Sequence, residues 1–323
     1  MSRLGEFDYI AQYLAPLAAG CEGAFGLTDD AAQIASRSGL VITTDTLVEG
    51  VHFRKGDPWD LVARKALRVN LSDLAAMGAD PHAVLLSIVW PVKAAPDAMA
   101  AFAEGLKTDL THFDIPLIGG DTTRGGDRLV VTFAALGETD APLRRSAAKP
   151  GEDVYVSGTI GDAGLGLAAA KQTGLNAAQR DALNERYLLP QPRHELAAAL
   201  RGNISAAIDI SDGLIADAGH VAAASGLGLR LHLTQLPLSD AAKSWVNAED
   251  DPVEALVTLA SRGDDYELLF CAPVSRRDAI AQASNKAGVP VTRVGTCHSG
   301  EGVLMLDASG KPVEISRRGF THF

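Results

Sequence analysis

The segment from Val41 to Phe53 constrains the fold of this chain more than any other. It begins as an apolar, β-branched run, which is typical of a buried strand. Four oxygen-bearing side chains follow in a row at residues 43–46, with the sequence Thr-Thr-Asp-Thr. Such a row fits poorly into a hydrophobic core and is well suited to a hard cation or a phosphate group. The segment therefore predicts a strand that ends in a binding site, with Gly50 and His52 close behind it.

Strand and helix patterns alternate along the chain, which predicts an α/β fold. Apolar runs predict strands at residues 39–46, 84–90, 115–118, 129–136, 153–157, 205–210, 227–233, 266–271, 291–296 and 303–306. Periodic apolar positions predict helices near residues 4–18, 57–77 and 97–111, with further helices in the second half. The strand at 115–118 is expected to open into a glycine-rich loop at 119–126, where the backbone can approach a ligand closely. Loops at strand ends are where α/β folds place function.

The pattern changes at the basic stretch from Arg144 to Gly151. We interpret this stretch as the boundary between two domains, residues 1–143 and 144–323. Its positive charge has two interpretations of equal weight. The stretch is a solvated linker, or one of its arginines turns back toward phosphate groups.

Composition excludes several classes of protein. The chain has 323 residues, of which 47% are hydrophobic, enough for one large or two ordinary domains. Its formal net charge of −11 disfavours a general nucleic-acid-binding protein. Three widely spaced cysteines, Cys21, Cys271 and Cys297, indicate a reducing compartment. With no apolar run of membrane-spanning length and no signal-peptide pattern, we expect a soluble, cytoplasmic protein that binds neither membranes nor nucleic acids.

Aspartates that are far apart in the sequence carry the main chemical signal. They are Asp29, Asp30, Asp45, Asp73, Asp121, Asp209 and Asp212. None has a histidine or cysteine at the spacing of a zinc site, and oxygen ligands favour magnesium or manganese. Several such ions in one acidic site usually accompany a polyphosphate substrate.

Two of these motifs have local alternatives. Asp29-Asp30 is also typical of a turn or a helix cap. Asp73 shares a helix face with Asn70 and lies in an apolar turn, where a buried carboxylate needs a partner. Asp73 is therefore a candidate metal ligand. In Asp209-Ile210-Ser211-Asp212, carboxylate and hydroxyl groups alternate before a helix, although a simple cap needs only one of them.

Other phosphate-binding and hydrolase motifs are missing from the sequence. It contains no GxxxxGK[ST] loop, no kinase catalytic loop and no GxSxG elbow. If the chain transfers phosphoryl groups, metal ions must neutralise the charge that a phosphate-binding loop neutralises elsewhere.

Together these motifs resemble the thiamine-monophosphate kinase family, of the aminoimidazole ribonucleotide synthetase-like superfamily. The matching motifs run in the family's order through nearly the whole chain: residues 43–53, 70–79, 119–122, 145–151, 209–214 and 265–268. The resemblance implies an α/β (α+β) fold of two domains. It implies an N-terminal mixed sheet with helices that binds metal and ATP and forms a homodimer, followed by a C-terminal α/β domain.

The resemblance also implies an activity: a phosphotransferase with a phosphate group as acceptor, which converts thiamine monophosphate and ATP into thiamine diphosphate and ADP in thiamine biosynthesis. Direct in-line transfer with several Mg²⁺ ions is implied.

The implied magnesium ligands are Asp30, Thr43, Thr44, Asp45, Asp73, Asp121, Asp209 and Asp212. The implied nucleotide contacts are Gly120, Asp121, Arg145 and Ser211, with Phe113 as an aromatic near the adenine. The implied acceptor contacts are His52, Asp264 and Phe320. The residues implied to act directly in transfer are Asp45, Asp73, Asp209 and Arg145. The Val41–Phe53 segment would then join the donor and acceptor sides of one site.

Three positions depart from the family pattern. Asp264 stands where the family usually has glutamate, which leaves its substrate role in doubt, and Thr28 and Ala147 stand where glycine is common. Competing interpretations are a selenophosphate synthetase-like enzyme, for which Cys21 lacks a suitable context, and a hydrogenase-maturation-like ATPase, which would end in cysteine where this chain has Phe323. A non-enzymatic acidic metal-binding protein would not need Arg145.

Overall fold

A computed structural model describes residues 9–21, 39–168, 174–315 and 319. The chain divides into two compact units. The N-terminal unit comprises residues 1–74 and 79–141, and the C-terminal unit comprises residues 75–78 and 142–323. The predicted sites at Asp29, Asp30 and Phe320 lie outside the described residues.

The N-terminal unit is built on a four-stranded mixed sheet. Its elements are η1 (Ile10–Leu14), η2 (Ala15–Ala18), β1 (Leu40–Val48), α2 (Trp59–Ala76), β2 (Asp80–Trp90), α3 (Pro96–Phe113), β3 (Leu117–Arg124) and β4 (Val130–Glu138). The strand order is β1-β4-β2-β3, in which only β2 and β3 are parallel. The mixed sheet predicted for this half is confirmed.

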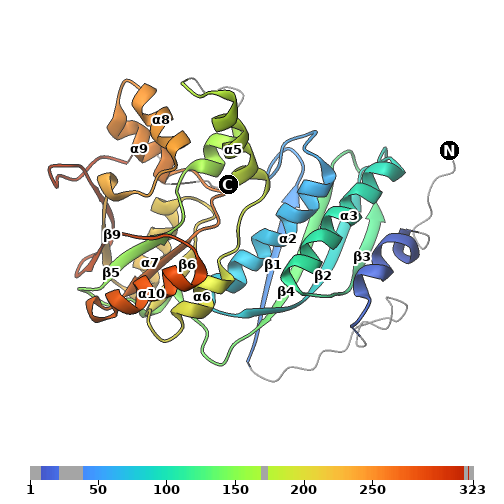
Figure 1. Cartoon of the computed structure of the whole chain (residues 1–323), viewed down its shortest axis with the longest axis horizontal. Coiled ribbons are helices and arrows are strands. Elements are labelled where there is room, and N and C mark those ends of the chain that lie inside the picture. The colour runs from blue at the N-terminus through green and yellow to red at the C-terminus, as the bar shows by residue number, and fades with distance from the viewer. Residues whose placement is uncertain (1–8, 22–38, 169–173, 316–318, 320–323) are drawn as a thin grey trace. The chain divides into compact units, whose positions relative to one another are not determined.

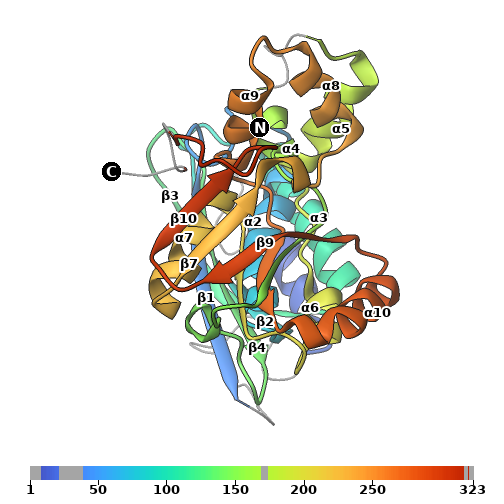
Figure 2. The same ribbon diagram turned by 90° about the vertical axis from the view of Figure 1, so that its left-hand side faces the viewer.

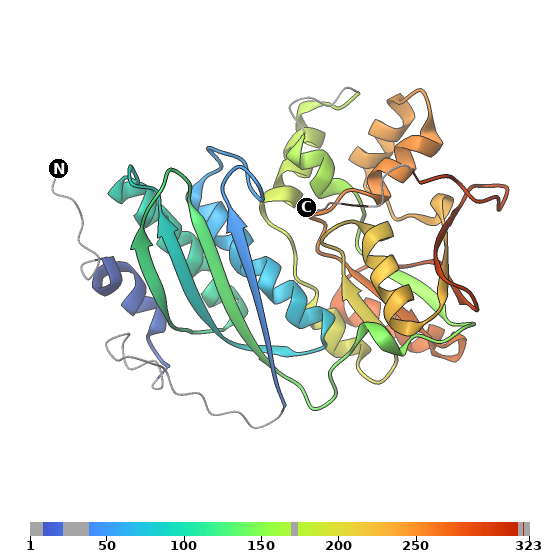
Figure 3. The same ribbon diagram turned by 180° about the vertical axis from the view of Figure 1, so that it is seen from behind.

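Helices α2 and α3 lie across one face of this sheet, as Figures 1 and 3 show from opposite sides. An aromatic cluster packs under them. The Trp90 ring lies 5.5 Å from that of Trp59 and 5.4 Å from that of Phe102, measured between centroids. The Trp90 indole N–H donates to the Thr122 hydroxyl at 3.0 Å. These contacts identify the face that carries Thr122 as the covered one.

The opposite face of the sheet keeps apolar side chains exposed. Because side chains alternate along a strand, β1 turns Thr43 and Asp45 toward the helices and Ile42 and Thr44 away from them. Ile42 is 63% exposed and Leu40 is 43% exposed, although both are aliphatic.

The glycine-rich run after residue 118 is not the loop that the sequence predicted. It continues β3 as far as Arg124, paired in register with β2. A Cβ atom at Gly120, whose φ is 150°, would lie 1.8 Å from the Leu86 carbonyl oxygen. Glycine is therefore needed here because two strands approach closely.

The C-terminal unit is built on a six-stranded sheet of order β10-β7-β9-β5-β8-β6. Its strands are β5 (Asp153–Ser157), β6 (Ala206–Asp209), β7 (Gly228–His232), β8 (Leu268–Ala272), β9 (Val291–His298) and β10 (Gly302–Leu306). Its helices are α4 (Asp162–Leu167), α5 (Ala177–Leu188), α6 (His194–Leu200), α7 (Leu214–Ser225), α8 (Asp240–Ala248), α9 (Pro252–Ala260) and α10 (Arg277–Ala287), with short turns η4 (Arg145–Ala147), η6 (Leu233–Gln235) and η7 (Val274–Arg276).

Helices cover both faces of this second sheet. Val154 and Ile208 pack with α7, whereas their neighbours Tyr155 and Ala207 pack with α6 and α10. Alternate strand residues point to opposite faces, so α7 lies on one side and α6 and α10 on the other. Helices α4, α5, α8 and α9 share a separate apolar cluster. Figure 2 shows these four helices together. In the described part of the chain, no helix combines the length and apolar composition needed to cross a membrane.

A buried carboxylate at the start of β5 makes the stability of the C-terminal unit depend on pH. Asp153 is 1% exposed and accepts hydrogen bonds from Arg277 at 2.6 Å and from Arg293 at 3.2 Å. The hydrogen bond from Arg277, chiefly, holds the pKa of Asp153 below its usual value of 3.8. A lowered pKa contributes stability that is present above the unfolded-state pKa and is lost as the pH falls through the folded-state pKa.

We therefore expect the free energy of unfolding of the C-terminal unit to fall below about pH 4. In Asp153→Asn the free energy should be lower at pH 7 and should change less as the pH falls below about 4, because the group whose pKa is lowered by folding is absent. Urea unfolding at a series of pH values measures both quantities. A variant whose acid dependence matches that of the wild type would contradict this assignment.

Candidate functional site

The N-terminal unit brings three of the predicted ligands together. The Thr43 hydroxyl on β1 donates to a carboxylate oxygen of Asp73 on α2 at 2.5 Å. The backbone N–H of Asp45 donates to the Asn70 side chain at 2.9 Å, and Asn70 is fully buried. Asp73 is only partly buried, whereas the sequence suggested a fully buried carboxylate. The predicted shared face of Asn70 and Asp73 is confirmed, because both contact β1.

Thr44 and Asp121 lie on the other face of the same sheet. Thr44 alternates with Thr43 and Asp45, and its hydroxyl donates to the Phe133 carbonyl at 2.8 Å. Asp121 is exposed and alternates with the buried Thr122. Strands β4 and β2 separate β1 from β3, a distance of about 14 Å. Within one N-terminal unit, the Asp121 side chain is therefore remote from the group formed by Thr43, Asp45 and Asp73.

His52 lies in a tight loop immediately after β1. Its Nδ1 accepts the backbone N–H of Val48 at 3.0 Å, so the proton of the neutral ring is on Nε2. Gly50 turns the loop with φ of 79° and donates its N–H to the Phe53 carbonyl at 2.7 Å. The loop and this hydrogen bond fix the orientation of the ring.

Phe113 and Arg145, which were predicted to contact nucleotide, lie in different units. Phe113 ends α3, where the Arg68 guanidinium lies 5.4 Å from its ring centroid. Arg145 is exposed, and its carbonyl accepts the Ser225 hydroxyl at 2.7 Å at the C-terminal end of α7. The twelve residues of α7 span about 18 Å, so the Arg145 backbone is anchored at the far end of this helix from Asp212.

The C-terminal unit joins two of the predicted motifs through backbone hydrogen bonds. We call residues 209–213 the acidic turn and residues 263–267 the acidic loop. The N–H of Asp264 donates to the Ser211 carbonyl at 2.9 Å, and that of Tyr266 donates to the Ile210 carbonyl at 2.8 Å. Returning in the other direction, the Ile210 N–H donates to the Glu267 carbonyl at 2.8 Å. These bonds extend the antiparallel ladder of β6 and β8 beyond the strands, so the acidic turn and Asp264 form one rigid part.

Asp264 and Tyr266 have φ values of 72° and 50°, a conformation that costs free energy in residues other than glycine. The residues next to them hold the loop in place. Asp265, 1% exposed, accepts the N–H groups of Gly161 at 2.7 Å and Ala163 at 3.2 Å. Burial raises the pKa of Asp265 well above its usual value, and these hydrogen bonds oppose the increase.

Glu267 anchors the other end of the loop and has no exposed surface. It accepts hydrogen bonds from Arg193 at 2.5 Å, from Arg186 at 2.8 Å and from the Ser157 hydroxyl at 2.6 Å. Burial by itself lowers the pKa of Arg186, but the nearby carboxylates, Glu267 first, give a net increase. Sequence analysis did not identify Arg186 or Arg193, since neither lies in a recognisable motif.

A second unpredicted residue, Asp217, holds the acidic turn from the α7 side. Its Oδ2 accepts the N–H groups of Ser211, Asp212 and Gly213, each at 3.1 Å. Burial first and the charge of Asp212 second raise the pKa of Asp217 to about 7, and the three N–H groups limit the increase. The one signal in the sequence for Asp217 is its place in the first turn of a predicted helix. Acids are common there in helices whose acids hold no neighbouring turn.

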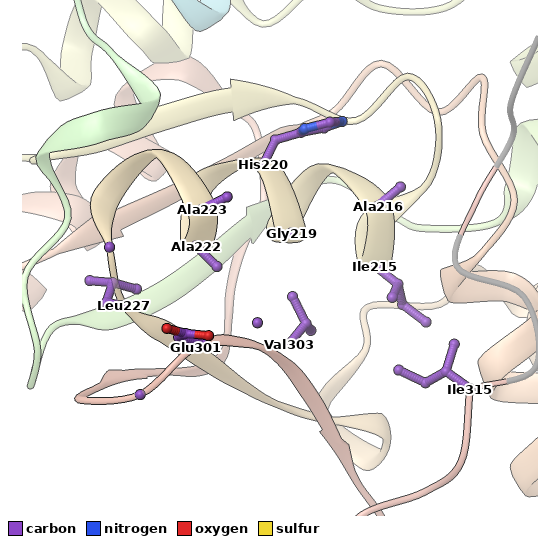
Figure 4. Close-up of a pocket in the computed structure, with 13 residues that line it drawn as sticks. Ile215, Ala216, Gly219, His220, Ala222, Ala223, Leu227, Glu301, Val303 and Ile315 are labelled. Carbon is purple, nitrogen blue, oxygen red and sulfur yellow. The ribbon is translucent and has the colours of Figure 1, made fainter.

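Two further features lie beside the acidic turn. A Cβ atom at Gly319 would lie 2.8 Å from the Asp212 carbonyl oxygen, so the residue preceding Phe320 packs against this turn. A cavity of about 890 Å³ lies between α7 and the segment that carries Glu301 and Val303 (Figure 4). Its walls are mostly aliphatic or small, and Glu301 adds a negative charge. Such walls do not suit a phosphate group.

Comparison with known proteins identifies the family of both units. Residues 28–139 match the model for the N-terminal domain of AIR synthase related proteins, and residues 149–306 match the model for the C-terminal domain. The predicted two-domain fold is thereby confirmed. A thiamine-monophosphate kinase of Caulobacter vibrioides is 44% identical over 322 residues, covering 98% of this chain and 90% of the relative.

Solved structures give the same result. A thiamine-monophosphate kinase from Stenotrophomonas maltophilia K279a superposes with a TM-score of 0.84 at 37% identity, covering 96% of this chain and 98% of that one. AaThiL complexed with AMPPCP and TMP superposes with a TM-score of 0.77 at 32% identity, covering 100% of this chain and 99% of that one.

A substitution at Gly263 tests how closely the acidic turn and the acidic loop are joined. A Cβ atom there would lie 2.2 Å from the Ser211 carbonyl oxygen. We expect Gly263→Ala to destabilise the C-terminal unit by about 1–3 kcal/mol, because the two segments must separate. We also expect faster hydrogen exchange at the Asp264 amide. The matched control is Gly219→Ala in α7, where a Cβ atom meets nothing within 4 Å. Equal effects of the two substitutions would contradict the close pairing.

Proposed function

The chain belongs to the thiamine-monophosphate kinases, within the AIR synthase related family, and we propose that it transfers the γ-phosphoryl group of ATP to thiamine monophosphate. The observation that supports this most strongly is the similarity, over the whole chain, to a relative solved with an ATP analogue and TMP. The products are thiamine diphosphate and ADP.

The reaction is difficult because donor and acceptor are both anions and the chain itself is acidic. The formal net charge is −11. Repulsion between phosphate groups is then the main obstacle to their approach, and divalent cations are the usual means of neutralising it.

The donor groups of both units suit Mg²⁺, because they are oxygens of carboxylates and hydroxyls. In the N-terminal unit, we propose Thr43, Asp45 and Asp73 as ligands, since they share one face of β1 and α2. In the C-terminal unit, we propose Asp209 and Asp212 of the acidic turn. Thr44, Asp121 and Asp30 remain predicted ligands. When bound, Mg²⁺ would neutralise charge on the phosphates.

The residues of this chain then position the reacting groups, which is most of what phosphoryl transfer requires of a protein. We propose direct in-line transfer without a phosphoenzyme. Ser211, held through its carbonyl by Asp264, would contact the nucleotide. Gly120, Asp121, Arg145 and Phe113 are proposed nucleotide contacts on the basis of the family resemblance.

For the acceptor, we propose contacts at His52, Asp264 and Phe320. His52 lies in the loop directly after β1, and its ring is held in a fixed orientation by the hydrogen bond from the Val48 N–H to Nδ1. The thiazolium ring of thiamine is cationic, so a carboxylate and an aromatic face suit it. Asp264 is one methylene shorter than the usual glutamate, but its backbone is fixed by the pairing with Ser211.

We further propose a homodimer formed through the face of the N-terminal sheet opposite α2 and α3, beside the part on which Ala18 of η2 packs. That face exposes Ile42 and Leu40, and large exposed aliphatic side chains are typical of an interface. It also carries Asp121 on β3, which two strands, β4 and β2, separate from the strand of Asp45. We therefore propose that the partner subunit supplies Asp121 to the metal and nucleotide site. Cytoplasmic location remains a prediction.

The competing superfamily activities have less support. A selenophosphate synthetase-like or hydrogenase-maturation-like enzyme would also use ATP, but the relatives above 30% identity described here are thiamine-monophosphate kinases. Incubation with ATP, Mg²⁺ and thiamine monophosphate, followed by chromatography for thiamine diphosphate, tests the proposal. ADP and free phosphate without thiamine diphosphate would favour a relative with another activity.

Single substitutions test whether both units are needed. We expect Asp45→Asn and Asp209→Asn each to lower kcat by at least about 10³-fold, since each removes one metal-binding charge. Circular dichroism and thermal unfolding should stay close to wild type for Asp45→Asn. Turnover comparable to wild type in either variant would contradict the ligand assignment.

Mixed dimers test whether the partner supplies Asp121. Asp45→Asn and Asp121→Asn chains, each inactive alone, are combined as tagged heterodimers. If Asp121 of one subunit and Asp45 of the other form one site, a heterodimer has one site with both residues intact and one site with neither. Its activity should then return to about half that of the wild-type dimer. Heterodimers as inactive as their parents would show that both aspartates act within one chain.

A further inference from the structure

Asp217 is a buried carboxylate that the proposed chemistry leaves unexplained. It lies one turn into α7 and is 2% exposed. Its Oδ2 accepts three consecutive backbone N–H groups, those of Ser211, Asp212 and Gly213. A helix cap usually satisfies one or two such groups, so three bonds to one oxygen indicate that this carboxylate sets the shape of the turn.

Consecutive N–H groups that converge at the start of a helix form a concave site attractive to anions. In nucleotide-binding proteins of other folds, a phosphate group occupies such a site. Here the protein's own carboxylate occupies it. The turn is therefore closed to a phosphate at these three amides.

The surroundings leave the acidic turn little freedom. Gly213 has φ of 118°, and a Cβ atom there would lie 2.8 Å from the carbonyl oxygen of Ser261. The Ser211 carbonyl accepts the Asp264 N–H, while the Ser211 N–H donates to Asp217. The peptide groups on both sides of Ser211 are thus held, one by α7 and the other by the acidic loop.

We propose that Asp217 is a positioning residue, which orients Ser211 toward the nucleotide and Asp212 toward the metal ion by holding their amide groups. The inference rests on the proposed function, because it assumes that the acidic turn binds metal and ATP. It assigns Asp217 no contact with either.

Direct coordination by Asp217 is the alternative. Ligand atoms of Asp212, Asp217 and His220 lie within 4.8 Å of one another. The hydrogen bonds restrict this alternative, because they occupy Oδ2 and leave Oδ1 as the one carboxylate oxygen that could coordinate. Positioning and coordination predict different behaviour for asparagine, which keeps a carbonyl oxygen and loses the charge.

The experiment compares Asp217→Asn, Asp217→Ala and Asp212→Asn with wild type by two measurements. The first is hydrogen exchange of the amides of residues 211–213 in metal-free protein. The second is Mn²⁺ binding by calorimetry in the presence of a non-transferable ATP analogue. Asp153→Ala is the matched control, since Asp153 is also a buried carboxylate of this unit and lies outside the acidic turn.

For Asp217→Ala, we expect amide exchange at residues 211–213 to accelerate about tenfold or more, since three hydrogen bonds are lost. Mn²⁺ should bind about 10–100-fold more weakly, as for other residues that orient metal ligands. Asp217→Asn should stay within about threefold of wild type in both measurements, because an acceptor oxygen remains. The Asp153→Ala control should bind Mn²⁺ as wild type does.

Two results would overturn the proposal. Unchanged Mn²⁺ affinity in Asp217→Ala, with faster exchange, would leave Asp217 a purely structural role. Mn²⁺ affinity in Asp217→Asn as weak as in Asp212→Asn would make Asp217 a ligand. If Asp217→Ala does not fold, the comparison of Asp217→Asn with Asp212→Asn still decides between positioning and coordination by Asp217. Thiamine diphosphate formation by wild type is assayed in parallel, and its failure would refute the proposed function separately.

Discussion

The backbone pairing of the acidic turn with the acidic loop is the constraint on which the C-terminal unit depends. It continues the β6–β8 ladder into the residues of the proposed site and fixes Ser211 and Asp264 relative to each other. Three buried acids fix the two segments through their hydrogen bonds: Asp217, Asp265 and Glu267. Each accepts N–H groups of the backbone or of arginines, so its desolvation is compensated. The rigidity offsets the unfavourable φ values at Asp264 and Tyr266, and strained residues of this kind are common at functional sites.

The two kinds of carboxylate in this chain therefore have different tasks. Buried acids are satisfied by hydrogen bonds and shape the backbone, while Asp45, Asp73 and Asp212, which are partly exposed, are the carboxylates that we propose for cations. Asp209, the first residue of the acidic turn, is 3% exposed and ends β6, so this proposed ligand is itself buried. The amides that converge at the acidic turn are occupied by Asp217 and not left open for a phosphate group.

Periodicity in the sequence was sufficient to predict the alternating strands and helices and the shared face of Asn70 and Asp73. It failed at the glycine run of β3, because the close approach of Gly120 to Leu86 depends on the neighbouring strand. Alternation also implies that Thr43 and Thr44 point to opposite faces, which the grouping of both as ligands overlooked. The anchors of Glu267 were beyond local patterns, since Arg186 and Arg193 lie 81 and 74 residues away in the sequence. The domain limits rest on the change of sequence pattern at residues 144–151 and the ligand roles on the family resemblance, and both remain predictions.

The central claim is that carboxylate-bound metal ions and a rigid turn position two phosphates for one direct displacement. The stereochemical course of the reaction tests it most directly, with ATP made chiral at the γ-phosphorus by oxygen isotopes and thiamine monophosphate as acceptor. A single in-line transfer inverts the configuration at phosphorus in the thiamine diphosphate formed. Retention of configuration would require two successive displacements through a phosphoenzyme and would contradict the account.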